Sequence, residues 1–180
     1  MKNFYFTTLI AALFFVACQG PQKPTYSSDF AKKRIDSMQK VMRGYDELDT
    51  ALAGQMMKAY QRYVDSFPQD SLAAVYLLKK ADIQKLMPNQ QQEALTTYRR
   101  VVDQYRYTPQ GPRAVMASAL LYEQTGAKGM AIASYNFLIA NYPSNPLAAD
   151  AKNLRDMLMN PEKDPLKQIE NWKKKAKETK

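Results

Sequence analysis

Aromatic residues recur along this chain at intervals of 37 or 38 residues. The recurring unit is a pair of aromatic side chains seven residues apart: Tyr60 and Phe67, Tyr98 and Tyr105, and Tyr135 and Tyr142. Periods of this length are typical of stacked helical pairs, in which each pair buries its apolar face against the next one. The period therefore predicts an all-α fold, a short solenoid of antiparallel helix hairpins.

The third copy shows the hairpin most clearly. The run after Pro112 is rich in Ala, Leu and Met, which favour helix, and we expect Pro112 at the first helical position. Gly126 can adopt the left-handed conformation that ends a helix. The second run continues to Asn141 and is stopped by Tyr142 and Pro143. The segment therefore predicts two helices joined by a tight turn.

These residues resemble the tetratricopeptide repeat (TPR). That family has a small residue and then an aromatic residue in the first helix, a glycine turn, an alanine and an aromatic residue in the second helix, and a closing proline. The positions that fit, in order, are Ala119, Tyr122, Gly126, Ala131, Tyr135 and Pro143. The resemblance covers about residues 45 to 159 and implies a curved array of helices.

We expect further helices on both sides of this copy. The expected ranges are 29–43, 48–67, 71–86, a helix ending at Tyr105, and 146–159. Asp70 and Asn145 are placed to cap the helices that follow them, and Pro146 comes directly after its cap. We also expect Asn89 to cap the helix that ends at Tyr105, with Gln92 as its capping-box partner.

The first residues of the chain have the pattern of a targeting leader. Lys2 supplies a short basic region, and the largely apolar run from Phe4 to Val16 has 13 residues, fewer than the roughly 20 that span a bilayer. The run ends in Ala17 and Cys18, the only cysteine. This resembles a bacterial lipoprotein signal, in which the cysteine is acylated and becomes the mature N-terminus. An ordinary secretory signal or an uncleaved anchor is the alternative.

This leader divides the chain into four parts. Residues 1–17 are expected to be the signal peptide, 18–28 a lipid-anchored tether, 29–159 the helical repeat domain, and 160–180 a basic C-terminal helix or tail that caps the array. Gln19 follows the cysteine. By resemblance to sorting in Gram-negative bacteria, this implies anchoring in the outer membrane, and we expect the protein to face the periplasm.

The composition disfavours several kinds of chemistry. The chain has no histidine, its one cysteine is assigned to lipid, and no phosphate-binding glycine loop occurs. We therefore predict no enzyme, no cofactor and no metal site. The net charge is +9, which favours acidic partners, but the predicted compartment argues against nucleic acid.

The TPR resemblance also implies a binding face. In that family the concave face is lined mainly by first helices. The positions that correspond to it here are Lys79, Asp82, Arg113, Met116, Leu120, Glu123, Asp150 and Leu154. Apolar anchors mixed with charges suit an extended peptide or a partner helix. The tyrosines of the second helices are better explained as packing between helices than as a ligand site.

The C-terminal segment leaves two interpretations open. Leu166, Ile169 and Trp172 form a narrow apolar stripe among seven lysines. The segment can be a solubilising cap, which would cover part of the concave face, or it can contact anionic lipid, peptidoglycan or an acidic partner.

The chain therefore resembles TPR lipoproteins of the bacterial envelope, including, at the level of fold, the one in the β-barrel assembly machinery. This implies a non-catalytic scaffold that binds protein partners in envelope assembly. The alternative is a structural lipoprotein that contacts peptidoglycan or glycan through its basic tail.

Overall fold

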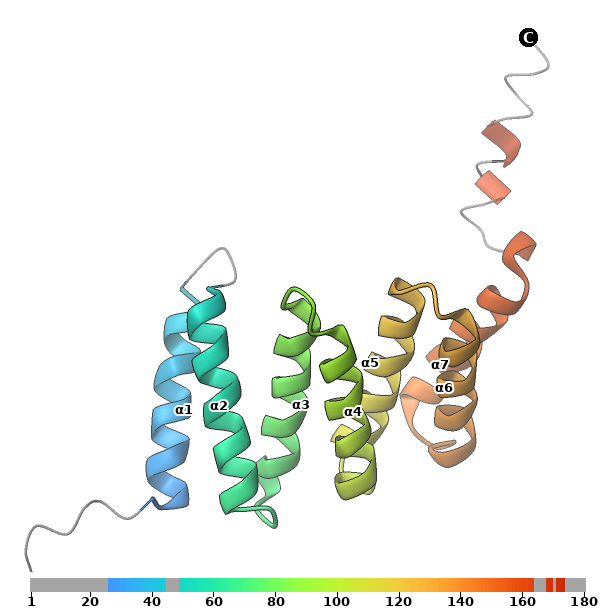
Figure 1. Cartoon of the computed structure of the whole chain (residues 1–180). Helices are drawn as coiled ribbons and strands as arrows, with labels where there is room; N and C mark the ends of the chain where they lie inside the picture. Colours follow the sequence, from blue (N-terminus) through green and yellow to red (C-terminus); the bar gives the residue numbers. More distant parts are fainter. Residues whose placement is uncertain (1–25, 45–48, 164–167, 170, 174–180) are drawn as a thin grey trace, which may run out of the picture.

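A computed structural model describes residues 26–44, 49–163, 168–169 and 171–173 of the 180-residue chain. The described part is all-helical, and each helix packs against the next one in the chain, which confirms the predicted fold class (Figure 1). The helices are α1 (Ser28–Met42), α2 (Thr50–Ser66), α3 (Ser71–Leu86), α4 (Gln91–Tyr105), α5 (Gln110–Gln124), α6 (Lys128–Asn141) and α7 (Pro146–Met159), followed by the short 3₁₀ helix η1 (Pro161–Lys163). The leader, Cys18 and most of the tether lie outside the described residues.

Helices α3 and α7 begin at their predicted caps, and α2 begins after a cap that was not predicted. The Asp70 side chain accepts a hydrogen bond from the Leu72 amide, and Asn145 accepts one from Leu147. Asp49 caps α2 through the amides of Ala51 and Leu52. Each cap satisfies amides that the first helical turn leaves without a partner.

Two predicted starts are wrong. Asn89 does not cap α4: its φ is 59°, in the left-handed region, and the N-cap is Gln90, which makes no side-chain cap bond. Asparagine tolerates this conformation, and Asn89 lies in the turn between α3 and α4. Gly126, with a φ of 76°, lies in the corresponding turn between α5 and α6. Helix α5 begins at Gln110, so Pro112 is its third residue. Its missing N–H is still harmless, because the first-turn amides have no partner within the helix.

The core is formed by small residues and tyrosines. Ala81, Ala94, Ala119 and Ala131 are fully buried, and each lets two helix backbones approach closely. Tyr60, Tyr98 and Tyr135 are at most 2% exposed, which confirms that the second-helix tyrosines pack between helices. Helix α7 also packs on the core, through Ala151 and the partly buried Leu147, Leu154 and Leu158.

Candidate protein-binding faces

The helices form an inner and an outer row. We call α1, α3, α5 and α7 the inner helices, because α3 contacts α5 and α5 contacts α7 directly. We call α2, α4 and α6 the outer helices. In the described part of the chain no close backbone approach joins α1 to α3. The inner row therefore opens at its N-terminal end, where α2 lies behind the gap.

A cavity of about 270 Å³ occupies this opening. We call it the inner cavity. The outer helix α2 contributes Met56 and Tyr60, both 2% exposed, and the inner helices contribute Met42 and Ile83. The remaining lining residues are polar or charged: Gln39, Arg43, Lys79 and Asp82. Methionine side chains adapt to differently shaped ligands, so this cavity suits an apolar side chain of a partner.

The outer-helix tyrosines are tied to the inner helices through their hydroxyls. Tyr98 donates a hydrogen bond to Asp82 at 2.7 Å, and Tyr135 donates one to Glu123. Tyr60 instead accepts one from the Gln39 amide at 2.9 Å. Burial, strengthened by the neighbouring carboxylate, raises the pKa of Tyr98 and of Tyr135 well above the usual value. These hydroxyls therefore stay protonated and hold each hairpin together.

The predicted face residues have different surroundings in the structure. Lys79 and Asp82 lie together on the wall of the inner cavity. Asp82 and Glu123 accept the tyrosine hydrogen bonds, so both acids also hold their own hairpins together. Arg113, Leu120 and Asp150 are exposed, Leu154 is half-buried, and Met116 is only 8% exposed. Met116 is therefore mainly a core residue, since it packs with Val115 and Ala119 of the same helix.

Ile169 and Trp172 do not cover this face. Ile169 is 44% exposed and Trp172 is 70% exposed, and Figure 1 shows the described pieces of this segment beyond the end of the stack. Leu166 lies outside the described residues. The part of the segment that is described therefore leaves the inner face open.

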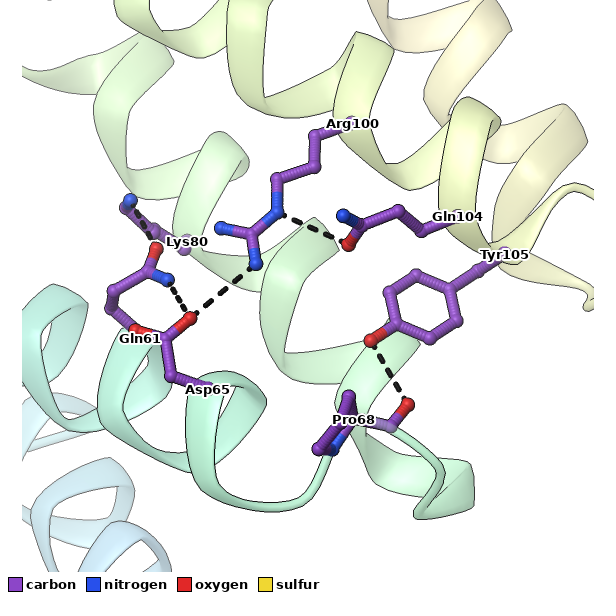
Figure 2. Close-up of polar contacts among 7 residues, drawn as sticks. All are labelled: Gln61, Asp65, Pro68, Lys80, Arg100, Gln104 and Tyr105. Atoms are coloured by element: carbon purple, nitrogen blue, oxygen red, sulfur yellow. Dashed lines mark hydrogen bonds and ion pairs between the residues drawn. The ribbon is translucent and has the colours of Figure 1, made fainter.

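The outer face has a polar network at its first junction, which we define as α2, α3 and α4. Figure 2 shows its side chains pointing toward one another across α3. Arg100 of α4 lies 3.4 Å from Asp65 of α2, which also accepts a bond from Gln61. Lys80 of α3 donates to Gln61 at 2.7 Å. Burial and the nearby Arg100 lower the pKa of Lys80. The network links the two outer helices, and Asp65, Arg100 and Gln104 also line a cavity of about 660 Å³ at this junction.

The second junction, formed by α4, α5 and α6, contains a groove of about 470 Å³, which we call the outer groove. Its apolar lining comes from all three helices and includes Leu95, Val102, Val115, Tyr122, Met130 and Phe137. Met130 is 53% exposed and Phe137 is 37% exposed. This groove was not predicted from the sequence. Met130 and Phe137, two apolar residues seven positions apart on α6, could have indicated it.

Within the described ranges, no group of three or more Asp, Glu, His or Cys side chains is placed to hold a metal ion. No helix in the part that the structure describes is long and apolar enough to cross a membrane.

Comparison with known families supports the repeat interpretation. A tetratricopeptide repeat model matches residues 76–106, which run from the middle of α3 to the end of α4. No curated protein matches the chain. The match and the helical stack together show a TPR-like protein. Repeats of this kind generally mediate binding to protein partners.

Proposed function

We propose that this protein is a non-catalytic scaffold, anchored by lipid to the outer membrane and facing the periplasm, that binds a protein partner in envelope assembly on its inner face. The observation that carries the binding part is the inner cavity. It combines an apolar floor with two cations, Arg43 and Lys79, at the opening between two inner helices. Apolar burial supplies affinity, and charges set the register of the partner.

The chemistry of the cavity defines the partner segment. One apolar side chain inserts between α1 and α3, against Met42, Met56 and Ile83. An acidic residue beside it faces Lys79 and Arg43. The exposed Leu120, further along the inner row, provides a second apolar contact at 40% exposure. A peptide or a partner helix with this pattern fits the face.

The test is site-specific photocrosslinking in intact cells. A crosslinker at Lys79 or at Leu120 is expected to capture the same protein, and one at the exposed Lys58 of the outer helix α2 is expected not to. Lys79→Glu should weaken capture from Leu120, because it places a like charge beside the acidic residue of the partner. Equal capture from all three positions, or none from the inner row, would refute an inner binding face.

The anchoring part is tested separately at Cys18. An acylated N-terminal cysteine carrying two or more chains gives firm anchoring, because each buried methylene contributes about 0.8 kcal/mol. The ten tether residues that follow Cys18, 19–28, then extend at most about 30 to 35 Å from the bilayer. Cys18→Ser should abolish labelling with a radioactive fatty acid and release the protein from outer-membrane fractions. A labelled Cys18→Ser protein would contradict lipidation at this residue.

A second candidate function is direct contact with peptidoglycan or glycan. The observation that favours it is the exposed Trp172 beside the exposed Lys173 in a lysine-rich segment. The purified protein should sediment with isolated sacculi at low salt, and removal of residues 161–180 should prevent this. Absence of sedimentation at low salt would exclude this candidate.

A further inference from the structure

The two junctions of the outer face are built on matching positions. Ala81 and Ala119, both fully buried, are 38 residues apart on the inner helices α3 and α5. Tyr98 and Tyr135, also fully buried, are 37 residues apart on the outer helices α4 and α6. These intervals align every position of one junction with a position of the other.

The alignment shows which side chains distinguish the two junctions where the outer groove lies. Lys80 of the first junction corresponds to Ser118 of the second, and Arg100 corresponds to Phe137. Two long cations of the polar network are thus replaced by a short hydroxyl and an aromatic ring. Both of these replacements line the outer groove.

The lining of the outer groove includes one acidic and one basic side chain, Asp103 and Arg99. Asp103 lines the outer groove at the position that Asp65 occupies in the first junction, 38 residues earlier. Asp65 is paired with Arg100, whereas Asp103 makes no ion pair among the described residues. A ligand that carries a cation next to apolar side chains would therefore suit the second junction. Its cation would pair with Asp103 as Arg100 pairs with Asp65, and its apolar side chains would fill the groove.

The C-terminal segment of the chain carries this combination. Ile169 precedes Trp172 by three residues and Lys173 by four, the spacing of residues on one side of a helix. All three are exposed. The described pieces of the segment lie beyond the end of α7, away from α4 and α5 (Figure 1). In this arrangement it is presented to another molecule.

We propose that the outer groove binds the C-terminal segment of a second copy of this chain. Trp172 of one copy packs against Met130 and Phe137 of the other, and Lys173 pairs with Asp103. The groove–segment contact then forms twice in a symmetric dimer, because each copy contributes one groove and one segment. This interface lies on the outer face and leaves the inner cavity accessible.

Sedimentation velocity of the purified protein over a concentration series tests this proposal. The wild-type protein should dimerise, and the fluorescence of Trp172, the only tryptophan, should shift to shorter wavelength as the dimer forms. Trp172→Ala should weaken dimerisation at least tenfold. Ser118→Lys with Phe137→Arg transfers the cations of the first junction into the groove and should have the same effect while preserving helix content. Asp103→Asn, a milder change at the rim, should weaken dimerisation severalfold and reduce its dependence on salt.

Mixing the variants gives the decisive control. The Trp172→Ala protein keeps an intact groove, and the Ser118→Lys, Phe137→Arg protein keeps an intact segment. A mixture should form a heterodimer through one groove and one segment, although neither variant self-associates strongly. A wild-type monomer at all concentrations, or dimerisation unchanged by these variants, would overturn the proposal. So would a Trp172 shift that does not depend on concentration, because the segment would then occupy its own groove.

Discussion

The first and second junctions have the same arrangement of helices, but different side chains occupy their matching positions. In the first, Tyr76 stacks on Tyr60 and meets Tyr63 edge-on, and a polar network covers α3. In the second, the position 38 residues after Tyr76 is Ala114, and the network is replaced by an apolar groove. The difference teaches that one stacking arrangement, with buried alanines and tyrosines at matching positions, accepts different surrounding side chains: a polar network in one junction and an apolar groove in the other.

The largest expected effect is alkaline destabilisation, to which Tyr76 contributes in the first junction. Burial raises the pKa of Tyr76 to about 12. Because its folded pKa exceeds the unfolded value of 10.0, its contribution is complete below about pH 10 and is lost as pH rises through about 12. The loss is about 1.4 kcal/mol near pH 11 and about 2 to 3 kcal/mol when complete. Urea titrations at increasing pH measure it.

The matched variants for this prediction are Tyr76→Phe and Tyr107→Phe. Tyr76→Phe keeps the ring but cannot ionise, so the fall in stability between about pH 10 and 12 should shrink by the amount given above. Tyr107 is 94% exposed, and its replacement should leave the pH profile unchanged. If Tyr76→Phe leaves the dependence of stability on pH unchanged, ionisation of Tyr76 does not destabilise the protein.

The next largest effect concerns the first turn of α5, in the second junction. Ala73 of the first junction corresponds to Gly111 of the second. A Cβ added at Gly111 would lie 2.6 Å from the Arg106 carbonyl oxygen and 2.9 Å from the Tyr142 hydroxyl. Gly111→Ala should therefore lower the free energy of unfolding by about 1 to 3 kcal/mol. Urea denaturation followed by circular dichroism measures this change.

Gly54→Ala is the control for that substitution. A Cβ at Gly54, inside α2, meets nothing within 4 Å, and alanine is the better helix former. It should stabilise the protein by about 0.5 to 1 kcal/mol. Equal effects of the two substitutions would show that the close approach at Gly111 does not limit the second junction.

The tyrosine hydroxyls should contribute similarly to both junctions. Tyr98→Phe and Tyr135→Phe each remove a hydrogen bond to a carboxylate and should each cost about 1.5 kcal/mol. Tyr60→Phe removes a bond from the neutral Gln39 amide and should cost about 0.5 to 1 kcal/mol. Thermal and urea denaturation of the three variants give this order. A larger cost for Tyr60→Phe would show that the charge of the partner does not set the contribution.

The smallest effect is expected at the outer network. The Asp65 and Arg100 side chains are 56% and 36% exposed, so solvent and salt screen their pairing. Arg100→Phe should change stability by less than about 1 kcal/mol. It should nevertheless open an apolar groove in the first junction that binds a hydrophobic dye, and Phe137→Arg should reduce dye binding at the second. Unchanged dye binding in both variants would mean that these positions do not distinguish the junctions.

Most of the fold could be predicted from the sequence because it depends on local signals. The bounds of α3 and α7 were predicted correctly, since Asp70, Asn145 and Pro146 act on the adjacent amides. Asn89 was misassigned because the same short amide side chain serves both helix caps and left-handed turns, and the choice depends on how the hairpin closes. Of the predicted face residues, Lys79 and Asp82 share a cavity, while Met116 is buried by packing that no local pattern shows.

By itself, the sequence determined the helices, their period and their buried tyrosines, because capping, helix propensity and apolar spacing act within a few residues along the chain. It also carries the lipoprotein-like leader, from which the anchoring remains a prediction. Only the tertiary structure decided which side chains meet across hairpins: that Tyr98 reaches Asp82, and that Arg100 pairs with Asp65 while Phe137 lines an apolar groove. These two pairs join residues 16 and 35 positions apart, and their geometry depends on how whole helices pack.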